Sequence, residues 1–170
     1  MTETQRSIIL NGDMDRKVFG WLESHLGPVT RFAPHARWRT GWDAEVSRDG
    51  ALLALYIRGP RGENYTSPIN MAQEAAIHRA YLANGIKVPQ VIGLIDDPEA
   101  LVLERIPGMI NTGSIADGGT QKKVREDFVD IMAAIHRLPP NAFAEVGLDV
   151  PEGADAVSRN LYAASEAIFD

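Results

Sequence analysis

The chain has 170 residues, with 17 basic and 23 acidic side chains, a formal charge of −6 and 45% hydrophobic residues. This composition is typical of a globular protein and argues against a disordered or fibrous chain. The absence of cysteine excludes a disulfide scaffold, a thiol nucleophile and thiolate metal sites. The sequence has no apolar stretch long enough for a membrane span and no secretory signal, and its pI near 5.2 argues against nucleic-acid binding. We therefore expect a cytoplasmic protein.

The N-terminal residues predict an amphipathic helix. Apolar side chains recur at helical spacing after Asp13, which is the expected N-cap, and Gly27-Pro28 ends the pattern. The apolar face consists of Met14, Val18, Leu22 and Leu26. Because one side of this helix is apolar, we expect it to pack on another part of the chain.

Residues 29–57 change from helical to strand periodicity. The Asp49-Gly50 step predicts a hairpin turn, because glycine accepts the backbone angles that tight turns need. Strands are expected over residues 29–32, 42–47 and 51–57. The third of these is apolar at successive positions, which predicts a strand covered on both faces. A polar, glycine-containing loop is expected to follow it.

A second helix is expected after this loop. Ser67 and Pro68 are its predicted N-cap and first residue, because proline lacks an N–H that the first turn does not use. The helix is expected to end near Ala83, with Asn84-Gly85 as its C-cap.

The remaining sequence predicts a second hairpin and an α-helical segment. The expected elements are strands at 91–95 and 101–105, a flexible connector at 108–119, a helix at 120–138 stopped by two prolines, and a further helix after residue 153. The order helix, three strands, helix, two strands and helices indicates an α+β domain followed by the beginning of an all-α region.

The common signatures of nucleophilic and metal chemistry are missing. The four histidines lack metal-ligand spacing, and no serine lies in a GxSxG sequence. The sequence also contains no GxxxxGKS or GxxxxGKT phosphate loop and no GxGxxG. We therefore expect no catalytic nucleophile and no metal site.

Two other features point to a nucleotide site. Arg58 ends the most apolar strand and Glu74 lies 16 residues later in the next helix, so a strand cation could meet a helix carboxylate where phosphates bind. The segment LVLERIPG at residues 101–108 is an apolar strand leading into a Pro-Gly break, where free backbone groups could bind a flat heterocycle. The alternative is that Arg58 and Glu74 are surface residues without contact and that the segment is only a strand and a turn.

Together these segments resemble the N-terminal lobe of the aminoglycoside phosphotransferase family, which is related to choline kinases and more distantly to protein kinases. The matching pieces are LLALYIRGPRG (52–62), AQEAAIHRAYLANGIKVPQVIGLIDD (72–97), LVLERIPG (101–108) and DIMAAIHRLPP (130–140). They follow the family's order over most of residues 28–140. The resemblance is greatest to the branch related to the kinase-like domains of acyl-CoA dehydrogenase fusion proteins.

The resemblance implies a fold and a set of binding residues. The fold would be a kinase-like N-lobe, an antiparallel sheet with a packed helix, followed by the first helices of an α-helical lobe. Arg58 would contact the α- and β-phosphates of ATP (or GTP) with Mg²⁺, and Glu74 would be its helix partner. The backbone of Leu103 and Arg105 would bind the adenine edge. The segment HARWRTGW at residues 35–42 would cover the phosphates, although it has only one glycine.

The resemblance also implies what this chain cannot do alone. The sequence contains no His-Gly-Asp, which in the family begins the motif that orients the substrate hydroxyl and holds Mg²⁺. We therefore expect no catalytic residue and no metal ligand in it, and an inactive fragment of an enzyme that phosphorylates a small-molecule alcohol. The expected parts are residues 1–27 (an N-terminal helix), 28–107 (the nucleotide-binding lobe) and 108–170 (a linker and part of a helical lobe).

Two alternatives remain open. The chain could be a non-catalytic kinase-like binding or interaction module, which Arg58 in place of lysine and the glycine-poor loop both favour. It could also be an α+β domain whose likeness to kinases is accidental. For a kinase-like fragment without its second lobe, the apolar face of the 120–138 helix and the side of the sheet that faces the cleft are expected to be exposed and to promote self-association.

Overall fold

The computed structural model describes residues 8–35, 39–61, 67, 69–108 and 111–148. Its elements are α1 (Asp13–His25), β1 (Val29–Pro34), β2 (Arg39–Arg48), β3 (Ala51–Arg61), α2 (Met71–Ala83), β4 (Val91–Asp96), β5 (Glu99–Glu104), η1 (Thr112–Ser114), α3 (Gly118–His136) and η2 (Pro140–Val146). The predicted α+β class and order of elements are confirmed for these residues. The helix expected after residue 153 lies outside them.

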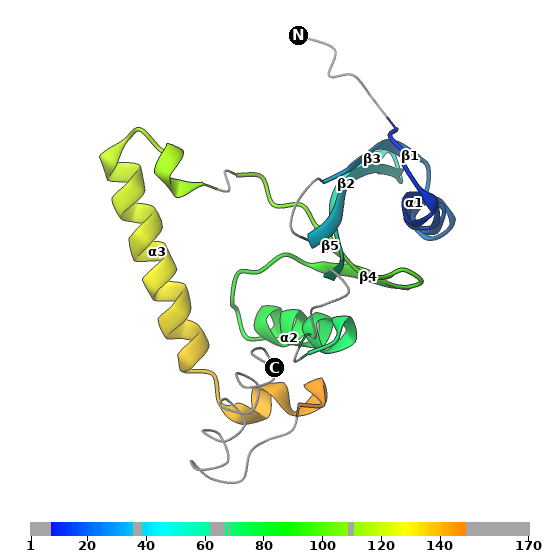
Figure 1. Cartoon of the computed structure of the whole chain (residues 1–170). Coiled ribbons are helices and arrows are strands. Elements are labelled where there is room, and N and C mark those ends of the chain that lie inside the picture. Colours follow the sequence, from blue (N-terminus) through cyan, green and yellow to red (C-terminus); the bar gives the residue numbers. More distant parts are fainter. Residues whose placement is uncertain (1–7, 36–38, 62–66, 68, 109–110, 149–170) are drawn as a thin grey trace, which may run out of the picture.

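The five strands form one antiparallel sheet in the order β1-β2-β3-β5-β4 (Figure 1). α2 connects β3 to the edge strand β4, and a tight hairpin then returns the chain into the sheet as β5. The predicted hairpins at 49–50 and 96–99 both form. β5 therefore lies between β3 and β4, and the segment after it leaves from the centre of the sheet.

α1 covers one face of the sheet and closes the larger hydrophobic core. Val18 and Leu22 are fully buried against strand residues that include Phe32 and Trp42, so the predicted packing of this helix is confirmed. The predicted N-cap at Asp13 is wrong: the helix starts there, and the N-cap is Gly12. Near this end of the helix, the carboxylate that accepts a backbone hydrogen bond is that of Asp15, which accepts from the Asn11 N–H at 2.7 Å.

α2 packs on the other face, over β4 and β5. Met71 and Ala75 are buried against Leu101 and Leu103, in a second and smaller core. The predicted N-cap at Ser67 is wrong, because α2 begins at Met71 with Asn70 as N-cap. Asn70 and Gln73 form a reciprocal capping box, with side-chain bonds of 2.8 and 3.1 Å, which satisfies two helix N–H groups at once. The predicted C-terminal end at Ala83 is confirmed.

β3 differs from its prediction in length and in burial. It continues past Ile57 to Arg61, so the expected loop from residue 58 is wrong over its first four residues. Leu55 and Ile57 are fully buried beneath α1, whereas Tyr56 and Arg58, on the opposite face, are only partly buried. α2 covers this second face over β5 but leaves it more open over β2 and β3, where polar side chains are gathered.

α3 lies away from the sheet and makes few contacts with it (Figure 1). Helix formation over most of the expected range 120–138 is confirmed, but no residue of α3 is buried. η2 instead lies against α2, where the Phe143 ring meets the Tyr81 ring edge-on at 5.6 Å. Among the described residues, no helix has both the length and the apolar character that crossing a membrane requires.

The N-terminus of α3 supplies a pH-dependent prediction. Asp117 is the N-cap, and its Oδ2 accepts from the Thr120 hydroxyl at 2.7 Å and from the Thr120 N–H at 2.6 Å. These bonds hold the pKa of Asp117 below its usual value. Because the folded-state pKa is depressed, the cap is complete above the usual aspartate pKa and is lost as the pH falls through the lowered value. We expect the amide NMR signal of Thr120 to titrate in this acidic window, and Asp117→Asn to abolish the titration while keeping the cap.

Candidate functional site

Three cross-strand pairs form a ladder on the open face of β2 and β3. Alternate residues of a strand share a face, and a one-residue bulge in β3 between Arg58 and Arg61 compensates for their odd separation, so the side chains of all three pairs lie on the same side of the sheet. The pairs are Asp43 with Tyr56, Gly41 with Arg58, and Arg39 with Arg61. The ladder therefore has an acidic and aromatic pair, Asp43 and Tyr56, at one end. Its other two pairs carry three arginines.

The middle of the ladder is tied to α2 by an ion pair. Arg58 Nη1 contacts Glu74 Oε1, and the two side chains are 27% and 12% exposed. The predicted meeting of these residues is thus confirmed, and the alternative that they lie apart on the surface is excluded. Glu74 lies in the first turn of α2, where the helix dipole favours a negative charge. The contact joins β3 to the only described helix on this face of the sheet that packs on the strands.

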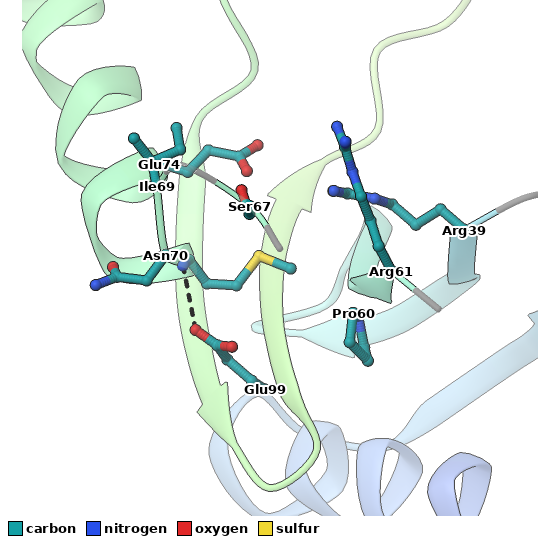
Figure 2. Close-up of a pocket in the computed structure, with 9 residues that line it drawn as sticks. Arg39, Pro60, Arg61, Ser67, Ile69, Asn70, Glu74 and Glu99 are labelled. Atoms are coloured by element: carbon teal, nitrogen blue, oxygen red, sulfur yellow. Dashed lines mark hydrogen bonds between the residues drawn. The ribbon is translucent and has the colours of Figure 1, made fainter. Parts of the chain in front are cut away.

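The arginine end of the ladder borders a pocket of about 260 Å³, which we call the guanidinium pocket (Figure 2). Arg39 and Arg61 come from β2 and β3, and Ser67, Asn70 and Glu74 come from the start of α2 and the segment before it. Arg39 is 8% exposed, which is unusual for an arginine. A second cavity of about 300 Å³ shares Arg61, Ser67 and Glu74 with it and is also lined by Arg58. The two cavities together bring three guanidinium groups to one region.

The other end of the ladder borders a more apolar pocket of about 440 Å³, which we call the linker pocket. His35 Nε2 lies 2.9 Å from Asp43 Oδ2, and the His35 ring is 6.0 Å from the Tyr56 ring. Ile106 and Gly108, from the segment after β5, also line this pocket. The pocket thus combines aromatic rings, two acidic residues, Asp43 and Glu104, and a stretch of non-strand backbone.

The linker backbone differs from the sequence-based expectation. The Arg105 N–H donates to the Ala54 carbonyl at 2.9 Å, so this donor is committed to the sheet and is not available for the adenine contact that the resemblance implied. Leu103 lies in the centre of the sheet, paired with both Tyr56 and Val91, and its side chain is 5% exposed. The physical reason is that the antiparallel ladder continues one residue past the end of β5. The open linker therefore starts at Ile106.

The Arg105 side chain has a structural role of its own. Its Nη2 donates to Glu45 Oε1 at 2.9 Å, and Arg31 Nη1 lies 3.6 Å from the same oxygen. The three side chains come from β1, β2 and the end of β5, on the same face as the ladder. This network extends the charged surface beside the linker pocket.

The segment HARWRTGW is also organised differently from its prediction. Residues from Arg39 onward belong to β2 and are not part of a covering turn, and residues 36–38 lie outside the described set. The single glycine, Gly41, faces Arg58 across the sheet. A Cβ at Gly41 would lie 3.1 Å from the Ile57 carbonyl oxygen and 3.5 Å from the Tyr56 hydroxyl. Gly41 therefore leaves space beside Arg58 and Tyr56.

Sequence reasoning did not assign an individual role to four residues of this site: Arg39, Arg61, His35 and Asp43. A signal for Arg61 was present in Arg58-Gly59-Pro60-Arg61, because proline and glycine within a strand indicate a bulge. No comparable local signal marks His35 and Asp43, which meet only through the pairing of β1 with β2. Searches against protein-family models, curated proteins and solved structures find no match to this chain.

Proposed function

We propose that this chain is the nucleotide-binding part of an ATP-dependent phosphotransferase of the aminoglycoside phosphotransferase type, acting on a small-molecule hydroxyl in the cytoplasm. The observation that carries the proposal is the ion pair between Arg58 of β3 and Glu74 of α2, within a five-stranded antiparallel sheet. A cation held by a helix carboxylate at the centre of such a sheet is suited to contact nucleotide phosphates. The guanidinium keeps the positive charge of the lysine usual in kinases, with a planar geometry.

The two pockets fit the two ends of a nucleotide. The linker pocket, with Tyr56 and His35, would hold the base of ATP or GTP, and Arg58 would contact the phosphates. On β2, Asp43 of the linker pocket and Arg39 of the guanidinium pocket are four residues apart on one face, or about 13 Å along the strand. Base and phosphates could therefore lie along the same ladder. Mg²⁺ would accompany the phosphates and neutralise part of their charge.

The proposed role of the chain itself is binding without turnover. Phosphoryl transfer depends on positioning the acceptor and on stabilising charge, and the family's His-Gly-Asp sequence that begins this machinery is not among these residues. In this proposal the residues of this chain bind and orient the nucleotide. The step that moves the phosphate would use groups outside the ladder.

Calorimetric titration of the protein with ATP·Mg²⁺ tests the proposal. We expect saturable binding that Arg58→Ala weakens by at least about tenfold, because a charge-assisted contact to phosphate is lost. Arg48→Ala is the matched control: Arg48 is at the far end of β2 and its side chain is 57% exposed. Equal heats for the wild type and Arg58→Ala, or an absence of heat for the wild type, would contradict the proposal.

A second candidate is a non-catalytic module that has kept a kinase-like lobe without binding nucleotide. The commitment of the Arg105 N–H to Ala54 favours it, since a linker donor is thereby removed from the pocket. The same titration separates the candidates. A folded wild-type protein that gives no signal with either ATP·Mg²⁺ or GTP·Mg²⁺ supports this module.

We also propose that a second copy of this chain covers the exposed apolar side of α3. Phe128 and Val129 are 63% and 62% exposed, and with Val124 they border a largely apolar hollow of about 480 Å³. We expect the molar mass from light scattering to rise with protein concentration, and Phe128→Glu to keep the protein monomeric. Leu52→Glu is the control, because Leu52 is equally exposed, at 61%, on β3. A wild type that stays monomeric at high concentration would contradict this proposal.

A further inference from the structure

We infer that the linker pocket selects guanine over adenine, with the Asp43 carboxylate as the group that reads the base. The inference rests on the proposed function, because it takes the base of a nucleotide as the occupant of this pocket, and it decides between the two bases left open there. The volume of about 440 Å³ is in the range of small-molecule sites and is sufficient for a purine. Three features carry the inference: the direction of Asp43, its contact with His35, and the donors and acceptors around the pocket.

The sheet holds Asp43 on its open face. The neighbours of Asp43 on β2, Trp42 and Ala44, are fully buried in the core beneath α1, and successive residues of a strand point to opposite faces. A one-residue slip of β2 would carry the carboxylate into this core, so the register is strongly specified. Ala33 of β1 and Tyr56 of β3 flank Asp43 on the two sides. The carboxylate therefore lies within the sheet and not at its edge, where it borders the linker pocket.

His35 orients this carboxylate. The His35 N–H donates to the Gly41 carbonyl at 2.8 Å, which holds the residue directly after β1. Its Nε2 lies 2.9 Å from Asp43 Oδ2, and because an ionised carboxylate only accepts, this ring nitrogen is the donor. The Asp43 side chain is 20% exposed, so it reaches the pocket and is partly removed from water. The bond from His35 uses one of about four acceptor positions of the carboxylate, and the others suit donors of a ligand.

The Watson–Crick edge of guanine is complementary to a carboxylate. Its N1–H and its 2-amino group are adjacent, parallel donors, so they can meet two carboxylate oxygens in the bidentate manner of a guanidinium. Adenine instead presents an N1 acceptor beside a single amino group. Its N1 lone pair would face a carboxylate oxygen, and two acceptors repel each other. Asp43 therefore favours guanine.

Other groups of the linker pocket agree with this choice. Arg105 borders the pocket, and its bond to Glu45 uses one of the five N–H donors of a guanidinium. Arginine pairs with the O6 and N7 acceptors of guanine, whereas adenine has an amino donor in place of O6. The Arg105 backbone N–H, a donor that adenine N1 could use, is engaged by the Ala54 carbonyl. Tyr56 adds a ring on which a base can stack.

Calorimetric titration of the wild type with four Mg²⁺-bound nucleoside triphosphates tests the inference without any substitution. We expect GTP to bind at least about tenfold more tightly than ATP, because a bidentate pair with the base discriminates to this extent. Inosine triphosphate, which lacks the 2-amino donor, should lie between them. Xanthosine triphosphate, which has a carbonyl oxygen at that position, should bind more weakly than GTP. A wild type that binds ATP as tightly as GTP overturns the inference.

Asp43→Asn tests the carboxylate itself, because the amide has the same shape but also donates. We expect the preference for GTP over ATP to be lost, and xanthosine triphosphate to bind more tightly than GTP, since the amide N–H can donate to its carbonyl oxygen. His35→Gln should lower the ratio of GTP to ATP affinity, a readout that a loss of stability alone would not move. Asp49→Asn is the matched control: it makes the same chemical change in the exposed β2–β3 turn, whose positive φ asparagine adopts readily.

Thermal unfolding without ligand checks that each variant is folded. A folded Asp43→Asn protein that keeps the wild-type ratio of GTP to ATP affinity overturns the assignment of Asp43. If Asp43→Asn does not fold, the four nucleotides on the wild type decide the question.

The possible outcomes separate guanine selection from the proposed function. If GTP and ATP bind equally and Arg58→Ala weakens both, the nucleotide function stands and guanine selection is wrong. If guanosine binds in a manner that depends on Asp43, while GTP is no tighter than guanosine and Arg58→Ala changes nothing, the guanine site stands and the phosphotransferase function is wrong. If the wild type binds none of these compounds, both are wrong.

Discussion

Replacing Trp42 with alanine is expected to lower the free energy of unfolding by about 3–5 kcal/mol, the usual cost of emptying a large buried aromatic site. Trp42 is fully buried and lies between α1 and the bulged end of β3. Its Nε1 also donates to Asp15 Oδ1 at 2.7 Å, so the same side chain packs the core and ties α1 to the sheet. Urea denaturation followed by circular dichroism measures the effect.

Two further variants separate packing from hydrogen bonding. Trp42→Phe keeps most of the ring and removes the donor, which leaves the buried Asp15 carboxylate with one partner fewer; we expect a loss of about 1–3 kcal/mol. Leu52→Ala, at an exposed apolar position, should change stability by less than about 0.5 kcal/mol. A Trp42→Ala cost as small as that of Leu52→Ala would show that Trp42 is not in the core.

The parts of the fold that the sequence predicted are those fixed by local chemistry. Asp49-Gly50 forms its hairpin, with positive φ at both residues, and Asn84-Gly85 ends α2, because these residues adopt turn and cap conformations with little dependence on their surroundings. The apolar stripe of α1 also determines which side of the helix packs on the sheet. For the candidate site, the same reasoning found Arg58 and Glu74, because a strand followed by a helix over 16 residues brings such residues together.

The parts that were not predicted depend on contacts distant in sequence. The cap at Asn70 is partly an exception, because its capping box with Gln73 is a local pattern that the sequence analysis overlooked; the long-range part is Glu99, which accepts from the Met71 N–H across the fold. The backbone of Arg105 was expected to bind the adenine edge, but its N–H donates to the carbonyl of Ala54 on β3, and only the sheet register shows that. A one-residue shift of register likewise decides on which face Arg61 lies.

The ion pair of Arg58 and Glu74 is expected to couple the stability of the lobe to ligand binding. Arg58→Met leaves a largely buried carboxylate without its cation, and we expect a loss of about 2–4 kcal/mol; Glu74→Gln should cost a similar amount. The double variant should recover part of this loss, because neither charge then remains alone. The expected coupling energy in urea denaturation is about 1–3 kcal/mol, and additive single effects would mean that the pair contributes nothing in solution.

Titration of the same variants with ATP·Mg²⁺ distinguishes an ion pair that only stabilises the fold from one that also positions Arg58 for ligand binding. Glu74 contacts Arg58 and is proposed to position it, so Glu74→Gln should weaken ATP binding less than Arg58→Met, which removes the contacting group itself. Arg58→Lys should retain more affinity than Arg58→Met, because a cation then remains beside Glu74. If the pair is only structural, affinity in the folded variants will match the wild type while stability falls. The nucleotide would then have to be bound by other groups of the ladder, and the assignment of Arg58 to its phosphates would be wrong.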